Sequence, residues 1–531
     1  MSGDGPELTV TNVAFAAIPV FLLIVTMLVG KLKWSAPRAG AVSWLAAVVL
    51  SVFVFGADQS IVVIGSSKGL SLSLFVLTII WTSVLLYNVI EKMGGISVIG
   101  ATMTRLVRDP LAQALIVGWA FSGLVQGVAG FGLPVAVVAP LLLMMGFSPV
   151  RAAVIALVGH SWAVTYGSLG SSFYTIQLVS GLDPDTLGPH MAAMFAVPTI
   201  VTGFAVAHLQ GGFGAIRKGW FAILLIGGAI SVSMWLTTVV GAYQVAAVVA
   251  GLVGCGVGWG LSRIPGLGLY GDQPVDLKPD NQSPNSLTFN LAFLPYYVLF
   301  ALSIASQVPV VREFGSDLRF GLDYPETITA KGFVISSVEA YAPIRFLNHP
   351  GPLILASLGI SYLVYRFRGV WHSGVGISAA KATYSQVVSN SVGVGTMVMM
   401  ALLMTTVGMT TLLGEAIARA TGPAFPLLSP YIGVLGTFMT GSNTNSNAMF
   451  GALQIGTAQA LGIGLVTIAA THSIGASFGS AIAMSKVMAG TVLVGLSGKE
   501  RDVLVKAIPY CILVVLTVGI QAWVIINVLD E

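Results

Sequence analysis

The side chains best suited to bind a ligand lie in one short polar segment within apolar sequence. The segment contains three asparagines, two serines and one threonine, namely Ser442, Asn443, Thr444, Asn445, Ser446 and Asn447. Amide and hydroxyl groups supply hydrogen-bond donors and acceptors without placing a bare charge in lipid. At membrane depth, irregular backbone persists only where it is buried in protein or lines a cavity. The segment therefore predicts a substrate-binding loop at the tip of a re-entrant hairpin. The alternative is a turn between two spans, or polar contacts that hold helices together.

A second interruption of the apolar sequence lies within residues 111–147. Near its middle stand Gln126, Gly130, Phe131 and Gly132, and Pro134 can begin a new helix. We expect the first four to bind substrate at the tip of a second hairpin; a glycine-rich helix-packing face is the alternative. Two such tips meeting near the bilayer midplane would expose helix N-termini, whose unpaired N–H groups and positive dipole ends suit a carboxylate.

Two nine-residue segments, 160–168 and 472–480, resemble each other, and each follows one of the interrupted regions. Both begin with His-Ser and end with Gly-Ser. The similarity predicts an internal repeat, with chance resemblance between glycine- and serine-rich sequences as the alternative. It adds five candidates for the substrate site, which are His160, Ser161, Tyr166, His472 and Ser473. Histidine gains and loses a proton near neutral pH, so His160 and His472 are also candidates to carry a coupling proton. A buried structural histidine is the alternative.

The remaining reactive residues give weaker signals. Lys486 lies deep in an apolar segment, where it could bind an anion or a helix carbonyl. Cys255 and Cys511 both lie in apolar runs and have no metal-ligand spacing, so we expect no metal site, no cofactor and no disulfide. The alternative from another class is a membrane-embedded enzyme that uses His160 or His472. The sequence has no H-E-x-x-H zinc motif, and we expect no enzyme activity.

The composition is that of a polytopic membrane protein. The 531 residues are 56% hydrophobic and 8% charged, whereas a soluble domain is typically about 25% charged. The expected fold class is all-α, with about 12 transmembrane helices plus two re-entrant helical hairpins in two inverted repeats. With the N-terminus outside, most Lys and Arg fall in inside loops, as the positive-inside rule requires. The hairpins then enter from opposite faces. The net charge of +4 is spread over the loops and gives no sign of a nucleic-acid partner.

The same pattern predicts the organisation of the chain. Residues 111–190 and 429–494 each combine a hairpin with a broken helix, and we expect them to form the two repeats of a transport domain. The other predicted segments are scaffold helices at 1–110 and 191–262, a cytoplasmic linker at 263–289, scaffold helices at 290–428 with an external loop at 309–350, and a C-terminal helix at 495–531.

Two motifs resemble the signatures of the bacterial lactate/glycolate permease family. The first is Phe121–Val135 followed by Gly146–Ala153, and the second is Thr440–Gly451 followed by Val494–Glu500. The resemblance covers nearly the whole chain in order and spacing. It implies secondary uptake of small 2-hydroxymonocarboxylates such as L-lactate or glycolate across the cell inner membrane, coupled to protons.

The family belongs to a wider group of ion transporters with inverted repeats and re-entrant hairpins. This analogy implies an elevator-type motion and a homodimer. In that group a Ser-Asn-Thr sequence at a hairpin tip, here Ser442, Asn443 and Thr444, contributes to binding carboxylate and sometimes sodium.

The chain departs from the family pattern at Gln126, where a glutamate is expected, and some members carry aspartate at the position of Asn443. An amide cannot gain or lose a proton, so these two positions cannot couple transport to protons. Either a histidine carries the proton, or sodium drives transport, or transport is uncoupled. The expected partners are thus a small carboxylate anion, H+ or Na+, and membrane lipid.

Overall fold

The protein is almost entirely helical. The computed structural model describes residues 7–28, 34–99, 109–128, 130, 132–266, 269–270 and 287–529. Within these ranges, ten helices are long and apolar enough to cross a membrane, or eleven when the bent pair Pro149–Ala163 and Gly167–Ser180 counts as one span. The predicted all-α class is confirmed. Most of the predicted 263–289 linker, and Phe131, lie outside the described residues.

The scaffold segment predicted at 191–262 includes two apolar runs, 191–209 and 219–238, which we expect to be separate spans. Both runs lie largely in the element α11 (Ala196–Val239), whose backbone leaves helical geometry at Gly211 and at Gly212, where φ is 66°. The two arms fold back on each other, because a Cβ added to Gly227 would lie 2.8 Å from Ile200 Cγ1 and one added to Gly203 would lie 2.9 Å from Ile223 Cγ2. The runs are therefore two separate helices joined by a glycine turn, as expected.

The centre of the molecule consists of two sets of broken helices. The first set is α5 (Pro110–Gln113), the π-helix η1 (Ala114–Phe121), α6 (Ser122–Val128), α7 (Leu133–Met144), α8 (Pro149–Gly159), the 3₁₀ turn η2 (Ser161–Ala163) and α9 (Gly167–Ser180). The second set is α18 (Phe425–Thr440), α19 (Asn443–Leu461), α20 (Leu465–Gly479) and α21 (Met484–Leu493). In each set, two helices joined by a short connection are followed by an interrupted helix.

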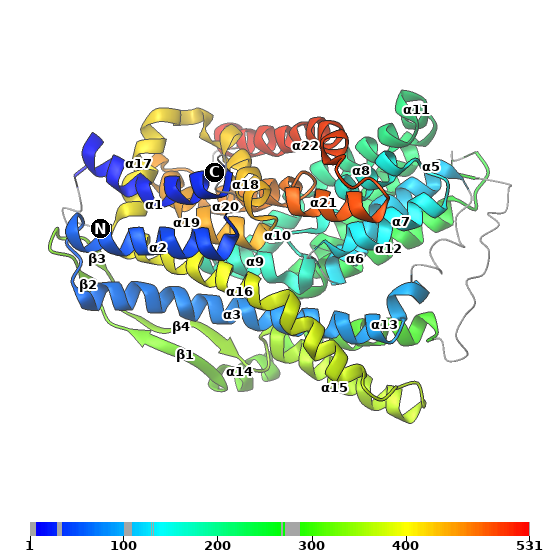
Figure 1. Ribbon diagram of the computed structural model, residues 1–531, viewed down its shortest axis with the longest axis horizontal. Helices are drawn as coiled ribbons and strands as arrows, with labels where there is room; N and C mark the ends of the chain where they lie inside the picture. Colours follow the sequence, from blue (N-terminus) through cyan, green and yellow to red (C-terminus); the bar gives the residue numbers. More distant parts are fainter. Residues whose placement is uncertain are drawn as a thin grey trace.

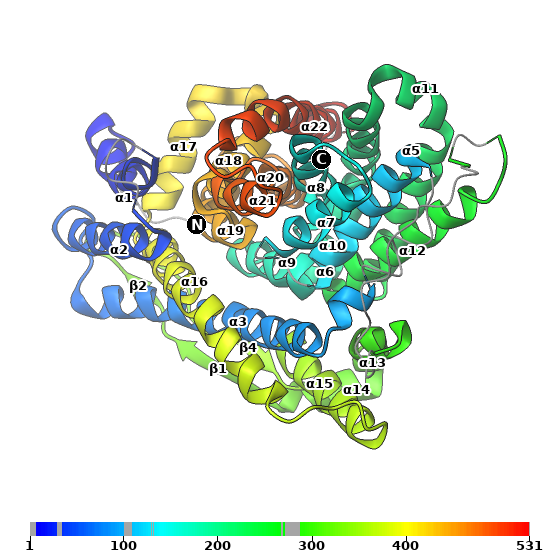
Figure 2. The ribbon, with the colours of Figure 1, turned by 45° about the vertical axis from the view of Figure 1, so that its right-hand side comes forward.

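The other elements surround this centre (Figures 1 and 2). They are α1 (Val10–Leu28), α2 (Ala36–Phe53), α3 (Gln59–Lys92), α10 (Pro184–Met194), α11, η3 (Tyr243–Val245), α12 (Ala246–Leu261), α13 (Phe289–Ser306), α14 (Pro309–Asp317), α15 (Pro350–Phe367), α16 (Val375–Thr406), α17 (Met409–Thr421), η4 (Gly422–Ala424) and α22 (Glu500–Val528). In Figure 2, α2, α3 and α16 lie along one side of the central elements, and α11 and α12 lie along another.

The central broken helices and the surrounding elements differ in how deeply they are buried. The most apolar stretch of Pro110–Val128 is wholly buried inside the protein, whereas most of the corresponding stretches of α1 and α22 are not. Exposed apolar residues on α22 include Ile512, Leu513 and Leu516. In a membrane such a surface faces lipid, and the elements with broken backbone are shielded from lipid by protein.

Hairpin 2, formed by α18 and α19, lies against α20 at backbone distance. A Cβ atom added to Gly475 on α20 would lie 2.1 Å from the Pro430 carbonyl oxygen on α18. One added to Gly433 on α18 would lie 2.2 Å from the His472 carbonyl oxygen on α20. Small residues at facing positions are the usual means by which helices approach closely in a membrane, where burial of apolar surface gives no driving force.

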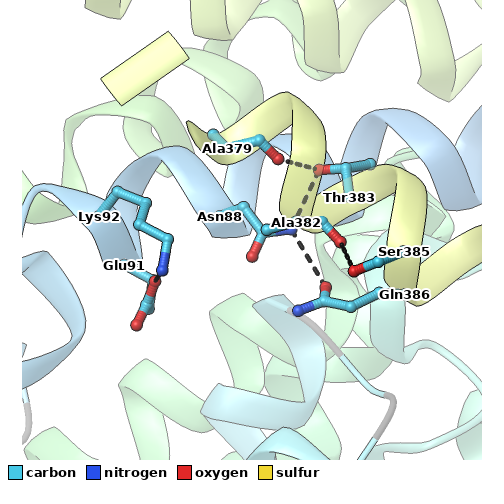
Figure 3. A network of polar contacts seen from close by, with 8 residues as sticks. All are labelled: Asn88, Glu91, Lys92, Ala379, Ala382, Thr383, Ser385 and Gln386. Atoms are coloured by element: carbon cyan, nitrogen blue, oxygen red, sulfur yellow. Dashed lines mark hydrogen bonds and ion pairs between the residues drawn. The ribbon is translucent and has the colours of Figure 1, made fainter. Parts of the chain in front are cut away.

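Polar contacts hold the surrounding helices α3 and α16 together. The Asn88 side-chain amide nitrogen donates to Thr383 Oγ1 at 3.0 Å and to Gln386 Oε1 at 3.1 Å (Figure 3). Trp81 Nε1 on α3 donates to Ser391 Oγ at 3.0 Å. These contacts join α3 and α16 over about two helical turns, so the two helices are held together beside the central elements.

The region 309–350, predicted as an external loop, contains α14 and four short strands. β1 (Arg319–Tyr324) pairs antiparallel with β4 (Val338–Arg345), and β2 (Thr327–Ile328) with β3 (Val334–Ile335). Tyr324 at the end of β1 attaches the region to α3, because its hydroxyl lies 2.8 Å from Ser67 Oγ and 2.7 Å from Ser71 Oγ. The strands are a small addition to an all-α protein.

Replacing Gly475 with alanine is expected to destabilise the protein, because the added methyl group meets the α18 backbone. Forced overpacking of this kind costs about 1–3 kcal/mol. The matched control is Gly228→Ala on α11, where an added Cβ has nothing within 4 Å. The thermal unfolding midpoint of the detergent-purified protein should fall for Gly475→Ala and not for Gly228→Ala. Equal midpoints would contradict the close packing of α18 on α20.

Candidate functional site

A small cavity lies where the two sets of broken helices meet. Its volume is ≈ 40 Å³. The residues around it come from the hairpin of α6 and α7 (hairpin 1), from the α9 region, from hairpin 2, from α21 and from α16. They are Gln126, Gly130, Val164, Ser168, Ser171, Ser172, Gly441, Ser442, Asn443, Thr444, Lys486 and Asn390. Eleven of the twelve are serine, threonine, amide, lysine or glycine residues, which present polar groups or bare backbone, and the twelfth, Val164, presents a small apolar surface. The cavity therefore suits a small polar ligand.

Three helices begin at this cavity. Asn443 and Thr444 form the first turn of α19, after the N-cap residue Ser442. Lys486 lies in the first turn of α21, and Ser171 lies near the start of the regular part of α9. The N–H groups of a first helical turn have no partner within the helix, and they carry the positive end of the helix dipole. Their convergence makes the cavity electropositive before any side chain is considered.

Backbone strain next to the cavity positions the serines of α9. Ser168 and Leu169 have φ values of 48° and 53°, in the left-handed region that non-glycine residues rarely adopt, and Gly170 follows with φ 83°. The Ser168 hydroxyl accepts a hydrogen bond of 2.8 Å from the Gly130 N–H at the tip of hairpin 1. The strained turn thus joins the tip of hairpin 1 to the start of α9, and such strain is typical of functional sites.

Among the described residues that line the cavity, Lys486 is the one with a charged side chain. It is only 6% exposed, and its ammonium donates to Ser480 Oγ. Among the described residues the ion pairs are Lys92 with Glu91 and Lys218 with Asp109, so no carboxylate pairs with Lys486 there. An ammonium buried without a counter-ion is costly, which makes the cavity a binding place for an anion.

Unpaired amide groups also line the cavity. Gln126 and Asn443 are each 2% exposed, and their side-chain oxygens have no hydrogen-bond partner. The amide nitrogen of Asn390, on α16, is buried and equally without a partner. Because a buried amide without partners is destabilising, these groups favour a bound ligand or ordered water in the cavity.

Hydrogen bonds join the two sets of broken helices beside the cavity. The Asn443 amide nitrogen donates to Thr165 Oγ1 at 2.9 Å, and the Asn447 amide nitrogen donates to the Ser172 carbonyl oxygen at 2.9 Å and to Ser473 Oγ at 3.0 Å. Asn447 and Ser473, both predicted site residues, therefore hold the site together from behind the cavity wall rather than line it.

His160 also lies behind the cavity wall. Its Nδ1 is 2.8 Å from the Ala156 carbonyl oxygen and its Nε2 is 3.0 Å from Ser480 Oγ. Ser480 is the residue that Lys486 contacts, so His160 connects to the cavity through one side chain. The Ser161 hydroxyl donates to the Val158 carbonyl oxygen and does not line the cavity.

His472 has a different environment, within hairpin 2 and α20. Its Nδ1 is 3.2 Å from Gln454 Nε2, and its Nε2 is 3.3 Å from the Ser446 carbonyl oxygen. The Ser446 hydroxyl donates to the Gly433 carbonyl oxygen at 2.8 Å. The two repeat-equivalent histidines thus differ, because the helix breaks directly after His160, whereas α20 continues past His472 to Gly479.

Three further predicted residues lie around the site without lining the cavity. The Tyr166 hydroxyl donates to the Gly188 carbonyl oxygen at 2.6 Å, and its ring stacks on Phe173. Gly132 has φ 85° and precedes α7, where its conformation allows the hairpin to turn. The Asn445 side-chain oxygen is buried without a partner. Of the predicted set, the cavity is lined by Gln126, Gly130, Ser442, Asn443 and Thr444.

Several lining residues were not predicted as site residues, and they are Val164, Ser168, Ser171, Ser172, Asn390, Gly441 and Lys486. The serines follow the His160 segment directly, and their concentration in apolar sequence is a signal that could have located them. Asn390 offers no such signal, since it stands among other polar residues of a long helix.

The described residues give no support to a metal centre or a nucleophile. No group of three or more His, Cys, Asp or Glu residues could hold a metal within the part of the chain that the structure describes. Residues 475–479 match G-x-S-x-G, but Ser477 lies inside α20 rather than on a strand-to-helix turn, and its hydroxyl donates to the Ser161 carbonyl oxygen.

Comparison with known proteins identifies the family. The model of the L-lactate permease family matches residues 12–529. The chain belongs to this family. Relatives include L-lactate permease from Escherichia coli K12, 26% identical with 96% of each chain covered, and the glycolate permease GlcA of the same strain, 25% identical with 97% and 96% covered. L-lactate permease from Bacillus subtilis is 24% identical, with 95% and 94% covered.

Solved structures with a similar arrangement include the YdaH transporter of Alcanivorax borkumensis, at TM-score 0.49 and 15% identity over 99% of both chains. MtrF of Neisseria gonorrhoeae gives TM-score 0.45 and 14% identity over 98% and 95% of the two chains.

Membership of this permease family and the apolar helices together establish a multi-pass inner-membrane protein. They identify it as a transporter rather than an enzyme.

Tyr166→Phe tests whether the hydroxyl of Tyr166 stabilises the fold or contacts the ligand. Loss of the hydroxyl leaves the buried Gly188 carbonyl without its donor, and the expected cost is about 1–3 kcal/mol. The thermal unfolding midpoint of the purified permease should therefore fall, while its affinity for the transported anion stays within about twofold, since Tyr166 does not line the cavity. Unchanged stability with a large loss of affinity would instead show that Tyr166 contacts the ligand.

Proposed function

We propose that this permease is a secondary active transporter of small organic monocarboxylates such as L-lactate or glycolate. The observation that carries the proposal is Lys486, a buried ammonium with no carboxylate partner among the described residues, at a cavity where helix N-termini converge. Charge-assisted hydrogen bonds from an ammonium and from N–H groups are the usual means of holding a carboxylate. The names of the relatives, L-lactate permease and glycolate permease, support the same class of substrate.

The size and the lining of the cavity favour a small hydroxy acid. A buried water needs roughly 10–15 Å³ of such space, so ≈ 40 Å³ holds only a few groups of that size. One end offers Lys486, and the hydroxyls of Ser171, Ser172 and Thr444 can bind an alcohol oxygen. A single cation suits one carboxylate rather than two.

The buried centre is proposed to move as a transport domain against the surrounding helices, in an elevator-type alternating-access mechanism. Its two repeats correspond to the predicted segments 111–190 and 429–494, and the scaffold corresponds to 1–110, 191–262 and 290–428. The support is that eleven of the twelve cavity-lining residues belong to the two repeats, and Asn390 on α16 belongs to the scaffold. A substrate held almost wholly by one body can travel with it.

Coupling to protons is the favoured driving force, with sodium coupling or uncoupled transport of another small organic anion as the alternative. A homodimer is also part of the proposal, by analogy with related transporters. No described residue that lines the cavity is a carboxylate. The expected glutamate coupling cannot operate at Gln126, so another titratable group must carry the proton.

The direct test is counterflow in proteoliposomes that contain the purified protein. L-lactate, glycolate, longer hydroxy acids and dicarboxylates are compared, with and without sodium and a pH gradient. Saturable exchange of monocarboxylates, and little exchange of dicarboxylates, is expected. Absence of saturable exchange for every small organic anion would contradict the proposal.

Lys486→Gln is expected to weaken substrate binding at least about 30-fold, because removing one partner of a buried charge pair costs ~2 kcal/mol or more. Lys68→Gln is the matched control, since Lys68 is also buried (4% exposed) but lies on α3 beside the Tyr324 ring, away from the cavity. Affinity is measured by competition against counterflow of labelled L-lactate. Equal effects of the two substitutions on affinity would show that Lys486 does not bind the substrate.

Asn443→Ala is expected to reduce uptake about tenfold or more while the protein stays folded, since a hydrogen bond to the ligand and the contact with Thr165 are both lost. Asn445→Ala, two residues along the same helix, is the control because Asn445 does not line the cavity. Initial uptake rates are normalised to folded protein from size-exclusion chromatography. Wild-type uptake by Asn443→Ala would refute the assignment.

A further inference from the structure

The ammonium of Lys486 is held by a hydroxyl that is not part of the cavity. A lysine carries its charge on a long flexible stem, so other groups must set where that charge lies. Within the described part of the chain, the Lys486 ammonium donates to Ser480 Oγ, at the residue that directly follows α20. Ser480 is wholly buried and does not line the cavity. It therefore contacts the binding cation without being placed to contact the ligand.

Ser480 is itself held by His160. Its Oγ lies 3.0 Å from His160 Nε2, and His160 Nδ1 lies 2.8 Å from the Ala156 carbonyl oxygen on α8. His160 is the residue at which α8 ends and η2 begins, and it is wholly buried. Both ring nitrogens thus have a partner, and the orientation of the ring is fixed.

The direction of each hydrogen bond follows from the chemistry of the groups. A carbonyl oxygen only accepts, so His160 Nδ1 carries a hydrogen and Nε2 of the neutral ring is an acceptor. Ser480 then donates its hydroxyl hydrogen to Nε2. An ammonium only donates, so a lone pair of Ser480 Oγ accepts from Lys486. Because His160 takes the hydroxyl hydrogen, the serine presents a lone pair to the ammonium.

The three side chains come from both sets of broken helices. His160 belongs to the first set, and Ser480 and Lys486 belong to the second. The same part of α20 is bonded to the segment after His160, since the Ser477 hydroxyl donates to the Ser161 carbonyl oxygen at 2.6 Å. The position of the cation therefore depends on how the two sets pack against each other.

We infer that Ser480 and a neutral His160 form a positioning pair, which holds the Lys486 ammonium at the cavity where it meets the carboxylate. This inference rests on the proposed monocarboxylate transport and assigns two positioning residues to that same site. Neither residue lines the cavity, so both act through Lys486. A cation that is already in place when the anion arrives lowers the ordering cost of binding, and the pair therefore raises affinity.

The neutral state of His160 is part of the inference. A protonated ring would donate from both nitrogens, and Ser480 would then lie between two buried positive charges. Such an arrangement without a carboxylate is costly. His160 is therefore assigned the role of a fixed hydrogen-bond acceptor.

The experiment measures exchange of labelled L-lactate in proteoliposomes, with rates normalised to folded protein. Two quantities are compared, which are the half-saturating concentration and the maximal rate. Ser480→Ala leaves Lys486 at the cavity but no longer holds it. The half-saturating concentration should rise about three- to tenfold, the cost of ordering one long side chain on binding. The maximal rate should stay within about twofold of wild type, whereas a role in folding alone would leave the half-saturating concentration unchanged.

Conservative variants test the two hydrogen bonds separately. Ser480→Thr keeps the hydroxyl, and its half-saturating concentration should stay within about twofold of wild type. His160→Gln keeps an acceptor for Ser480 and should behave in the same way. His160→Leu removes the acceptor and should raise the half-saturating concentration at least about threefold. The two His160 variants decide the matter if the extra methyl group of Ser480→Thr prevents folding.

Two controls address general damage to this region. Thr471→Ala removes another buried hydroxyl of α20, which donates to the Thr467 carbonyl oxygen in its own helix. His472→Leu removes the other buried histidine, whose described contacts are with Gln454 and Ser446. Both should keep the wild-type half-saturating concentration, whatever their maximal rates.

A double variant tests whether Ser480 acts through Lys486. In the Lys486→Gln background, Ser480→Ala should change the half-saturating concentration less than about twofold further, because the ammonium that it positions is already absent. Full additivity of the two substitutions would overturn the inference.

The remaining outcomes separate the positioning pair from the function on which it rests. A wild-type protein without exchange of any monocarboxylate would overturn the proposed function. Exchange by the wild type together with a wild-type half-saturating concentration in Ser480→Ala would overturn the positioning pair alone. A rise in His160→Gln as large as that in His160→Leu would also overturn it, because the acceptor at His160 would then have no part in binding.

Discussion

A buried positive charge with no carboxylate partner among the described residues is the constraint on which this structure depends. Broken helices inside a membrane protein must pair their exposed backbone and polar groups with other protein groups. Most of them do so here: Asn443 bonds to Thr165, Asn447 bonds to Ser172 and Ser473, and the Gly130 N–H bonds to Ser168. Lys486 donates to Ser480, and no carboxylate among the described residues pairs with it. The cavity is therefore left with an ammonium that is not neutralised and with the unpaired amide atoms of Gln126, Asn443 and Asn390.

The same contacts join the two sets of broken helices to each other. Each hairpin tip forms hydrogen bonds with residues of the broken helices and not only with the second helix of its own hairpin. Asn443 and Asn447 of hairpin 2 bond to the segment 165–172, and Gly130 of hairpin 1 bonds to Ser168 in that segment. The surrounding helices have their own polar contacts, such as Asn88 with Thr383 and Gln386. The hydroxyl of Tyr174 on α9 also donates to Gln244 Oε1 on η3 at 3.1 Å, so the proposed elevator-type motion has to break this hydrogen bond between the two bodies.

Much of this organisation could be predicted from the sequence, because a polar or glycine-rich interruption is rare in apolar sequence. The segment Ser442–Asn447 and the region of Gln126 and Gly130 both lie at the centre of the fold. Which of their side chains line the cavity could not be predicted. In an α-helix adjacent residues point in different directions, so Asn443 lines the cavity while Asn445 does not. Which side chains of α19 line the cavity depends on where segment 165–172 crosses that helix.

The roles of the histidines show the same limit. The repeated sequence motif locates His160 and His472 correctly in equivalent positions of the chain, but their partners come from other segments. His160 meets Ser480 because α20 ends there, and His472 meets Gln454 because α19 runs beside α20. Lys486 is visible in the sequence as a lysine deep in an apolar run, yet its lack of a carboxylate partner is a property of the folded structure alone.

The most direct test of this account is a cryo-electron microscopy structure of the protein in lipid nanodiscs with saturating L-lactate or glycolate. The account predicts density for the carboxylate against Lys486 Nζ, between the first turns of α19 and α21, with the Lys486–Ser480–His160 contacts intact. Ligand density remote from Lys486, or a carboxylate side chain of the protein paired with Lys486, would contradict it.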